Sequence, residues 1–436
     1  MADDAAQLRT ENAQLREQLQ TLQSKYDALD AETSARIREL IDENELLADA
    51  NRVLLENEAV FKQLLPIVTG ATPAEAALSQ IPDELLLPGD GLATTPAATL
   101  ANVHSIGNLL SVAVPVDKRH IAVTGGVDKH IVAHDWTQQR KLCAYEASGP
   151  VLDIAFNPNP EYSAFFVASF MDATHALLKV DETDGTWAIE PIAKFHDHAR
   201  PGAMRVAWST NGELFATASC DKSVHVYRCT NLSSRSEPPV CEKVKSYYFN
   251  GIVEAMTFVP AAADGSLNEM LVIAVRDDCY VHYVDCQTFE KERINMNQDD
   301  IEHVSYTIMD LRVSPNGKYL LAATDKDRHF IFAVKSNIVY RSLYGHKAGP
   351  YSQPRVVWHP SAKYVISNSE ETGTLFVWCV ASERVVDQIE AHDKLIRGIA
   401  VTSSLDDQNA AIVLTVSYDK RLKAWKSTAL GANPSP

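Results

Sequence analysis

The chain has 436 residues, of which 46% are apolar and 22% charged, and its formal net charge is −17. This composition supplies ample material for a core, excludes a chain that is disordered throughout, and argues against general nucleic-acid binding. No apolar run reaches the ~18–20 residues of a membrane span, and the first residues do not have the pattern of a secretory signal. The seven cysteines form no CxxC pair, which predicts reduced thiols. We therefore expect a cytoplasmic or nuclear protein that does not insert into membranes.

Residues 1–65 are predicted to form a coiled coil. They contain neither Gly nor Pro, and leucines recur at a seven-residue step, which is the d position of a heptad. A four-residue shift after residue 33 is typical of a stutter, which unwinds the supercoil without ending the helix. Asn residues occupy three a positions, where paired Asn side chains favour two parallel strands. We expect a homodimer, and the alternative is one amphipathic helix packed on its own domain. The residues predicted to dimerise are Leu8, Leu15, Leu22, Leu29, Leu40, Leu47, Leu54, Asn12, Asn44 and Asn51.

Residues 66–100 are predicted to be a linker. They hold five prolines and three glycines among many Ala and Thr residues. Proline interrupts helices and glycine lowers order, so that most of this segment is expected to be a flexible tether.

From residue 101 the sequence changes to short apolar runs separated by Asp-, Gly- and Asn-containing turns, which predicts strands. A turn acid recurs at Asp128, Asp172, Asp221, Asp277, Asp325, Glu371 and Asp419. The separations are 44, 49, 56, 48, 46 and 48 residues. Seven units of ~40–50 residues are typical of a propeller with four-stranded blades, whereas a β-sandwich, the alternative, would not show this longer period.

These units resemble the repeats of WD-repeat (WD40-type) β-propeller proteins over residues 101–428, with a tail at 429–436. In that family a His, a Ser or Thr, an Asp and a Trp form a hydrogen-bonded relay inside each blade. The last repeat has all four as His392, Ser417, Asp419 and Trp425, and the third approximates them with His198, Ser219, Asp221 and Tyr227. The resemblance also implies that residues 94–103 supply the outer strand of the last blade. The expected fold is an all-β seven-bladed propeller with an N-terminal α-helical coiled coil.

The sequence carries no recognisable catalytic motif. It has no G-x-S-x-G, P-loop or G-x-G-x-x-G pattern. His196 and His198, on either side of Asp197, could indicate a metal site. The favoured interpretation is one relay histidine with an exposed neighbour. His130 and His134 fall on a predicted strand, where residues four apart lie far from each other. We expect no enzyme activity, no metal and no cofactor.

The propeller plan suggests a non-enzymatic scaffold that binds other proteins or peptides, as in G-protein β subunits and Groucho-type corepressors, which are similar in plan. Arg205, Arg312, Arg355 and Arg397 recur in first-strand segments of four repeats, and an arginine-rich funnel would suit acidic or phosphorylated segments. The alternative is that these arginines are solvated or paired. The second functional hypothesis is a propeller enzyme or ligand-binding propeller with a site in the central channel. It would require a His or carboxylate that recurs in the first strands, and none was identified in the sequence.

Overall fold

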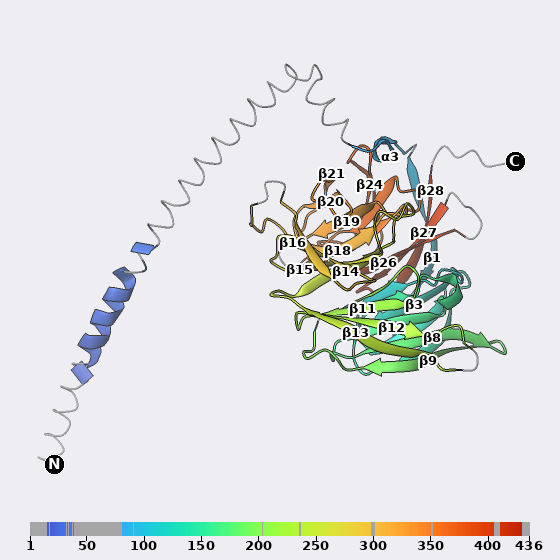
Figure 1. Cartoon of the computed structure of the whole chain (residues 1–436), viewed down its shortest axis with the longest axis horizontal. Helices are drawn as coiled ribbons and strands as arrows, with labels where there is room; N and C mark the ends of the chain where they lie inside the picture. Colours follow the sequence, from blue (N-terminus) through green and yellow to red (C-terminus); the bar gives the residue numbers. More distant parts are fainter. Residues whose placement is uncertain are drawn as a thin grey trace, which may run out of the picture. The chain divides into compact units, whose positions relative to one another are not determined.

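The computed structural model describes residues 15–38 (except 17, 32, 34 and 37), 81–89, 91–202, 204–234, 237–297, 301–349, 352–404 and 410–429. The chain divides into two compact units, Met1–Pro82 and Asp83–Pro436. In the first unit, residues 18–31 are helical. The second unit contains seven four-stranded antiparallel sheets (Figure 1). We call these sheets blades 1–7, in the order in which their first strands occur along the chain.

The first strand of each blade is the innermost, and the next strands follow outward in chain order, except that the outer strand of blade 7 is β1. Blade 1 contains β2 (Leu109–Ala113), β3 (Ile121–Gly126), β4 (His130–Asp135) and β5 (Arg140–Glu146). Blade 2 contains β6 (Val151–Phe156), β7 (Phe165–Phe170), β8 (His175–Thr183) and β9 (Thr186–Phe195), with the short 3-10 helix η1 (Pro160–Tyr162) before β7. Blade 3 contains β10 (Met204–Trp208), β11 (Leu214–Ser219), β12 (Ser223–Thr230) and β13 (Val240–Tyr248).

The remaining blades repeat this order. Blade 4 contains β14 (Val253–Val259), β15 (Met270–Val275), β16 (Tyr280–Asp285) and β17 (Lys291–Asn295). Blade 5 contains β18 (Ile308–Val313), β19 (Tyr319–Thr324), β20 (Arg328–Ala333) and β21 (Val339–Tyr344). Blade 6 contains β22 (Val356–Trp358), β23 (Tyr364–Asn368), β24 (Thr374–Cys379) and β25 (Val385–Glu390). Blade 7 contains β26 (Ile396–Ser403), β27 (Ala410–Ser417), β28 (Leu422–Ala429) and β1 (Leu92–Leu100).

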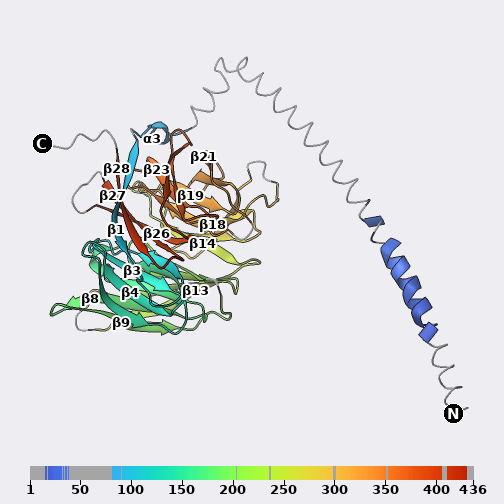
Figure 2. The same ribbon diagram turned by 180° about the vertical axis from the view of Figure 1, so that it is seen from behind.

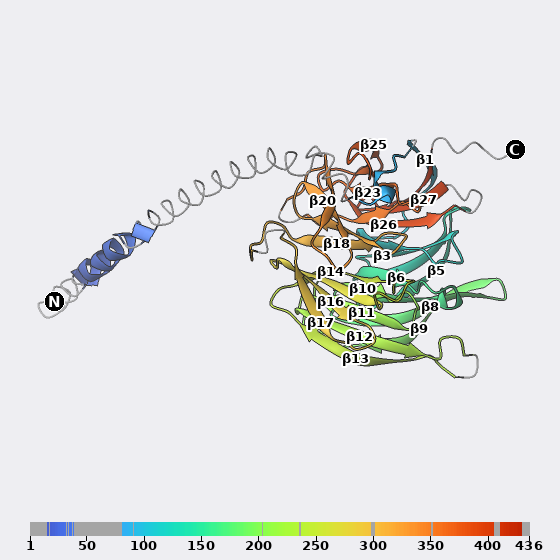
Figure 3. The ribbon, with the colours of Figure 1, turned by 45° about the horizontal axis from the view of Figure 1, so that its top comes forward.

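The blades close into a ring. The first strand of each blade contacts the first strand of the next, and β26 of blade 7 contacts β2 of blade 1. In Figure 3 the labelled first strands β6, β10, β14, β18 and β26 lie near one another in the middle of the second unit. The last blade is completed from the other end of the chain, because β1 pairs antiparallel with β28, with Leu92 opposite Ala429 and Leu100 opposite Leu422. The paired strands are visible from both sides of the molecule (Figures 1 and 2).

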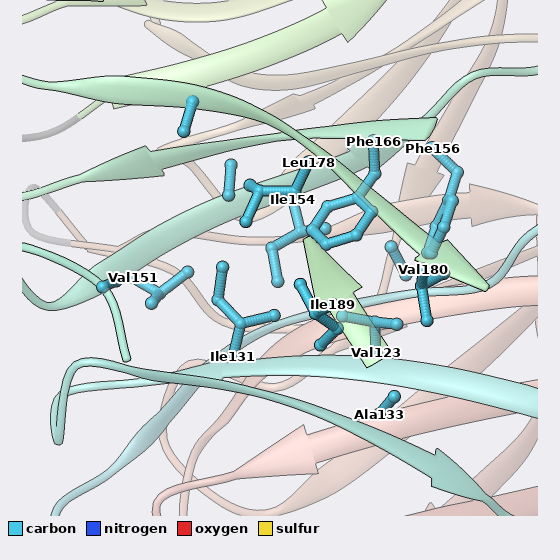
Figure 4. Packing of buried hydrophobic residues seen from close by; sticks show 14 of the residues in the cluster. Val123, Ile131, Ala133, Val151, Ile154, Phe156, Phe166, Leu178, Val180 and Ile189 are labelled. Carbon is cyan, nitrogen blue, oxygen red and sulfur yellow. The ribbon is translucent and has the colours of Figure 1, made fainter. Parts of the chain in front are cut away.

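Burial follows strand position in the blade. The second strands are buried along their length, as in β3, β7, β11 and β15, which explains why they are nearly continuous apolar runs in the sequence. The outer strand β25 alternates between half-buried and exposed residues. Figure 4 shows how side chains from blades 1 and 2 interdigitate, with Val123 and Ile131 packed towards Ile154 and Phe166. Stacking of neighbouring blades therefore supplies the core that one sheet could not form alone.

The end of the predicted linker is part of the propeller. The helix α3 (Asp83–Leu86) lies before β1, and Leu85 is only 3% exposed. Glu84 accepts a hydrogen bond from Tyr319 and pairs with Lys318 of blade 5 at 3.3 Å. Gly91 donates its backbone N–H to Tyr364 of blade 6 at 3.0 Å. The expectation of a flexible tether extending towards residue 100 is therefore corrected from residue 83 onward; residues 66–80 lie outside the described residues.

Candidate functional site

The relay expected inside blade 7 is present, but one member differs. His392 Nδ1 lies 2.9 Å from Asp419 Oδ2, and His392 Nε2 lies 2.8 Å from Thr415 Oγ1. Trp425 Nε1 donates to the same Thr415 hydroxyl at 3.1 Å. The relay hydroxyl is therefore Thr415 and not Ser417, whose hydroxyl donates to a backbone carbonyl at 2.9 Å.

Blade 3 repeats this arrangement and needs the same correction. His198 Nδ1 lies 3.2 Å from Asp221 Oδ2, and His198 Nε2 lies 2.9 Å from Thr217 Oγ1. Ser219 instead accepts the backbone N–H of Asp221 at 3.3 Å. Tyr227, at the Trp position, donates its hydroxyl to a carboxylate outside the relay.

A third relay, in blade 1, was not predicted from the sequence. His104 Nδ1 lies 2.8 Å from Asp128 Oδ1, and His104 Nε2 lies 2.9 Å from Thr124 Oγ1. His134 takes the place of Trp, with its Nε2 3.4 Å from Thr124 Oγ1. The available signal was spacing: His104 precedes its Asp by 24 residues, close to the 23 and 27 residues of the other relays.

These relays are interior features. The side chains of His104, His198 and His392 are 0% exposed, so they support the turns between second and third strands and cannot contact a partner. His134 belongs to the blade 1 relay, whereas the side chain of His130 is 39% exposed. Among the described residues, no group of three or more His, Cys, Asp or Glu side chains is arranged to hold a metal ion.

The expectation that the cysteines are reduced thiols is wrong for two of them. Cys229 of β12 and Cys241 of β13 are opposite each other in the strand register and form a disulfide. Cys143, Cys220, Cys279, Cys286 and Cys379 are free. The disulfide joins the third and outer strands of blade 3.

The four predicted arginines line one cavity. Arg205 of β10, Arg312 of β18 and Arg397 of β26 lie on first strands, and Arg355 directly precedes β22. Together with Asp153 and Asp310 they are the charged residues lining a cavity of about 560 Å³. We call this space, bounded by the first strands, the channel cavity. The sequence-based expectation that these side chains converge on one channel agrees with this geometry.

Two of the arginines are paired with carboxylates. Arg397 Nη1 lies 3.0 Å from Glu370 Oε2, and Arg397 Nε donates to the Tyr418 hydroxyl at 3.1 Å. Burial alone would lower the pKa of Arg397, but Glu370 and Tyr418 outweigh burial and raise this pKa. Arg312 Nε lies 3.5 Å from Asp310 Oδ2, and the Arg312 side chain is 46% exposed. The alternative interpretation, in which the arginines are paired or solvated, therefore describes these two.

The other two have weaker neutralising contacts. Arg205 Nε donates to the backbone carbonyl of Glu254 at 2.9 Å. Arg355 Nη1 is 3.9 Å from Asp310 Oδ1, beyond hydrogen-bonding distance, and its side chain is only 11% exposed. Burial lowers the pKa of Arg355 to about 10, and the charge of Arg205 acts in the same direction. Two positive charges therefore lie close enough to repel each other in the channel cavity.

The two aspartates of the channel cavity hold neighbouring blades together. Asp153 Oδ2 accepts the backbone N–H of Val206 in the next blade at 3.2 Å, and Asp310 Oδ2 accepts that of Val356 in the same way at 3.1 Å. The first strands of blades 2 and 5 thus do repeat a carboxylate, contrary to the expectation from the sequence. Both aspartates act as fixed acceptors between blades.

Residues 189–228 match the family model described as WD domain, G-beta repeat. No curated protein matches the chain in sequence. The matched segment begins within β9 and ends within β12, so that one sequence repeat spans the outer strand of blade 2 and the first three strands of blade 3. This offset explains why the last repeat lacks an outer strand and why β1 completes blade 7. The second unit is accordingly an all-β seven-bladed propeller that carries a WD repeat.

Proposed function

We propose that this chain is a non-enzymatic scaffold of the cytoplasm or nucleus that dimerises through its N-terminal helix and presents two propellers to partner proteins. WD-repeat propellers generally serve as protein-interaction scaffolds. In this proposal the arginine-lined channel cavity receives acidic or phosphorylated segments of a partner. Dimerisation would raise the apparent affinity for a partner with repeated segments, because the second contact becomes intramolecular.

The convergence of four arginines on one cavity is the observation that carries the partner chemistry. The lining contains four arginines and two aspartates, and Glu370 beside Arg397 adds one further negative charge. A positive surplus therefore remains in a chain whose net charge is −17. A local field of sign opposite to the rest of the molecule would steer an anionic segment to this place.

Binding of a fluorescent polyglutamate peptide to the full-length chain tests this proposal. We expect anisotropy to report binding that weakens as salt is raised to about 0.3 M, because exposed charge contacts are screened. Arg355→Glu combined with Arg397→Glu should abolish binding. The matched control is Lys194→Glu combined with Lys245→Glu, which makes the same charge change at exposed positions of the outer strands β9 and β13. Equal loss in both variants would show net charge alone to be responsible and would contradict the site.

Support for dimerisation comes from the described part of the N-terminal helix. Leu15, Leu19, Leu22, Tyr26 and Leu29 fall on the predicted a and d positions and are between 55% and 69% exposed in the single chain. A helix that exposes only a narrow apolar seam is expected to bury it against a partner, and we assign that partner as a second copy of this chain. The predicted residues Leu8, Leu40, Leu47, Leu54, Asn12, Asn44 and Asn51 lie outside the described residues.

Light scattering tests the dimer. The full-length chain should have twice the 48.1 kDa mass of one chain. Leu15→Lys combined with Leu22→Lys should halve the measured mass, because lysines in the seam would be buried without acceptors. Gln20→Lys combined with Ser24→Lys adds the same charge at positions outside the seam and should leave the mass unchanged. A monomeric wild-type chain at micromolar concentration would refute dimerisation.

A ligand-binding propeller is the second candidate, because the channel cavity has a volume of about 560 Å³, which is enough for a small molecule. It differs from the scaffold in requiring a site that binds a small molecule in the absence of any partner.

A further inference from the structure

The channel cavity contains one buried guanidinium without an acceptor. Arg355 has a side chain that is 11% exposed, and its nearest carboxylate oxygen, on Asp310, is 3.9 Å away. No hydrogen bond joins its guanidinium to any residue in the described part of the chain. A guanidinium carries five N–H donors, and those of Arg355 are not among the fully buried donors that lack a partner, so they reach the open space of the cavity. This arrangement indicates an acceptor that comes from outside the chain.

The neighbouring carboxylates are committed elsewhere. Asp310 Oδ1 accepts the backbone N–H of Leu311 at 3.1 Å, while Asp310 Oδ2 accepts that of Val356. Asp153 uses its two oxygens in the same way, for its own following residue and for the next blade. Turning either carboxylate towards Arg355 would break a contact between blades. Asp310 is moreover shared between Arg312 at 3.5 Å and Arg355 at 3.9 Å, so it does not neutralise Arg355 in full.

Arg205 supplies the second half of a site. Its Nε is held by a backbone carbonyl, which fixes the side chain without neutralising its charge. Arg205 and Arg355 line the same cavity. A phosphate group offers several acceptor oxygens and up to two negative charges, whereas a carboxylate offers two oxygens and one charge. Two guanidinium groups that face one space therefore match a phosphate better than a single carboxylate.

We propose that Arg205 and Arg355 bind one tetrahedral oxyanion, a phosphate group, inside the channel cavity. The group belongs either to free phosphate or to a phosphomonoester on a partner segment, and in the second case the inference rests on the proposed function. Asp153 and Asp310 limit the site to one such group, because a second phosphate beside the first would meet their negative charges. Arg312 and Arg397 lie outside the site, since each already has a carboxylate partner.

Calorimetric titration of the full-length chain with inorganic phosphate tests the site. One phosphate should bind per chain, and O-phosphoserine should bind similarly. Glutamate should bind at least about tenfold more weakly, because it offers a carboxylate in place of the phosphate. Arg355→Gln should remove the binding heat. Arg355→Lys should restore part of the affinity at most, since lysine keeps the charge but loses the planar fork. Lys335→Gln, outside the cavity, makes the same charge change and should bind as the wild type. Circular dichroism and thermal unfolding establish that each variant is folded.

The outcomes separate this inference from the proposed function. Failure of the wild type to bind either inorganic phosphate or O-phosphoserine, or unchanged binding by folded Arg355→Gln, overturns the phosphate site. If polyglutamate still binds in that case, the scaffold proposal survives and the cavity receives extended acidic segments. If phosphate binds and polyglutamate does not, the phosphate site stands and an acidic partner segment is refuted. Binding of O-phosphoserine but not inorganic phosphate would assign the site to a phosphorylated partner.

Discussion

Acidification below about pH 6.5 should destabilise the propeller through its buried histidines. Burial lowers the pKa of His134 to about 3 and those of His198 and His346 to about 4. Burial also lowers the pKa of His175 and His329 well below the ordinary value. The folded protein keeps these rings neutral, whereas the unfolded chain protonates them as the pH falls below about 6.5. Stability is thus complete above that pH and is lost progressively towards about pH 4.

The size of this effect follows from proton linkage. At about pH 5.5 a histidine that is protonated only when unfolded destabilises the folded state by roughly 1.4 kcal/mol. Five such residues give an upper limit of about 7 kcal/mol, which is comparable to the whole unfolding free energy of an ordinary domain, about 5–15 kcal/mol. We therefore expect acid unfolding to begin well above the pH at which carboxylates are protonated.

His175 allows a direct test. Neither of its ring nitrogens has a hydrogen-bond partner among the described residues. The ring stacks on Phe195 with centroids 4.9 Å apart and lies 5.1 Å from Tyr227. His175→Phe keeps the aromatic packing and removes two unsatisfied nitrogens, so it should add about 1 kcal/mol at neutral pH. It should also reduce the loss between about pH 7.5 and 5.5 by roughly 1.4 kcal/mol. Urea unfolding at a series of pH values measures both. A wild-type unfolding free energy that stays constant to pH 5.5, or an unchanged pH slope in His175→Phe, would refute the reasoning.

Two further predictions concern blades 7 and 3. Asp419→Ala should lower the unfolding free energy by about 1–3 kcal/mol, because it leaves His392 and the backbone N–H of Arg421 without their acceptor. The control Glu371→Ala, at an exposed turn residue, should change the unfolding free energy by less than about 0.5 kcal/mol. Equal melting temperatures for the two variants would contradict the relay. Cys229→Ser should destabilise the oxidised protein by up to about 3 kcal/mol, from the 12-residue separation of the disulfide. It should have little effect in reducing buffer, and identical melting of wild type and variant under both conditions would count against the disulfide.

The period of the turn acids was sufficient to predict seven blades, but not to choose the relay hydroxyl. Thr415 and Ser417 are two residues apart on one strand, so both side chains point to the same face. Only the pairing of β27 with its neighbours places Thr415 beside His392 and Trp425. Ser417 lies at the strand end, where its hydroxyl accepts the backbone N–H of Asp419.

The sequence also could not predict which residues the arginines of the channel cavity bond. The repeat placed the arginines on first strands, and this alone predicted that they would converge. Their partners are distant in sequence: Arg397 bonds a carboxylate 27 residues away, and Arg205 bonds a carbonyl 49 residues away. Cys229 and Cys241 show the same limitation, because their direct opposition depends on the register of β12 and β13.

The segment before β1 should determine where the propeller can be separated from the N-terminal helix. Leu85 and Leu92 are 3% and 7% exposed, and Arg341 donates to the Leu85 carbonyl at 2.9 Å. A chain beginning at residue 94 loses both leucines, each of which contributes about 1.5–3 kcal/mol when buried, and leaves the guanidinium of Arg341 without that acceptor. A chain beginning at residue 81 keeps these contacts. Urea unfolding should therefore find the longer chain more stable by about 3 kcal/mol or more. Equal unfolding free energies for the two truncated chains would show that this segment does not stabilise the propeller.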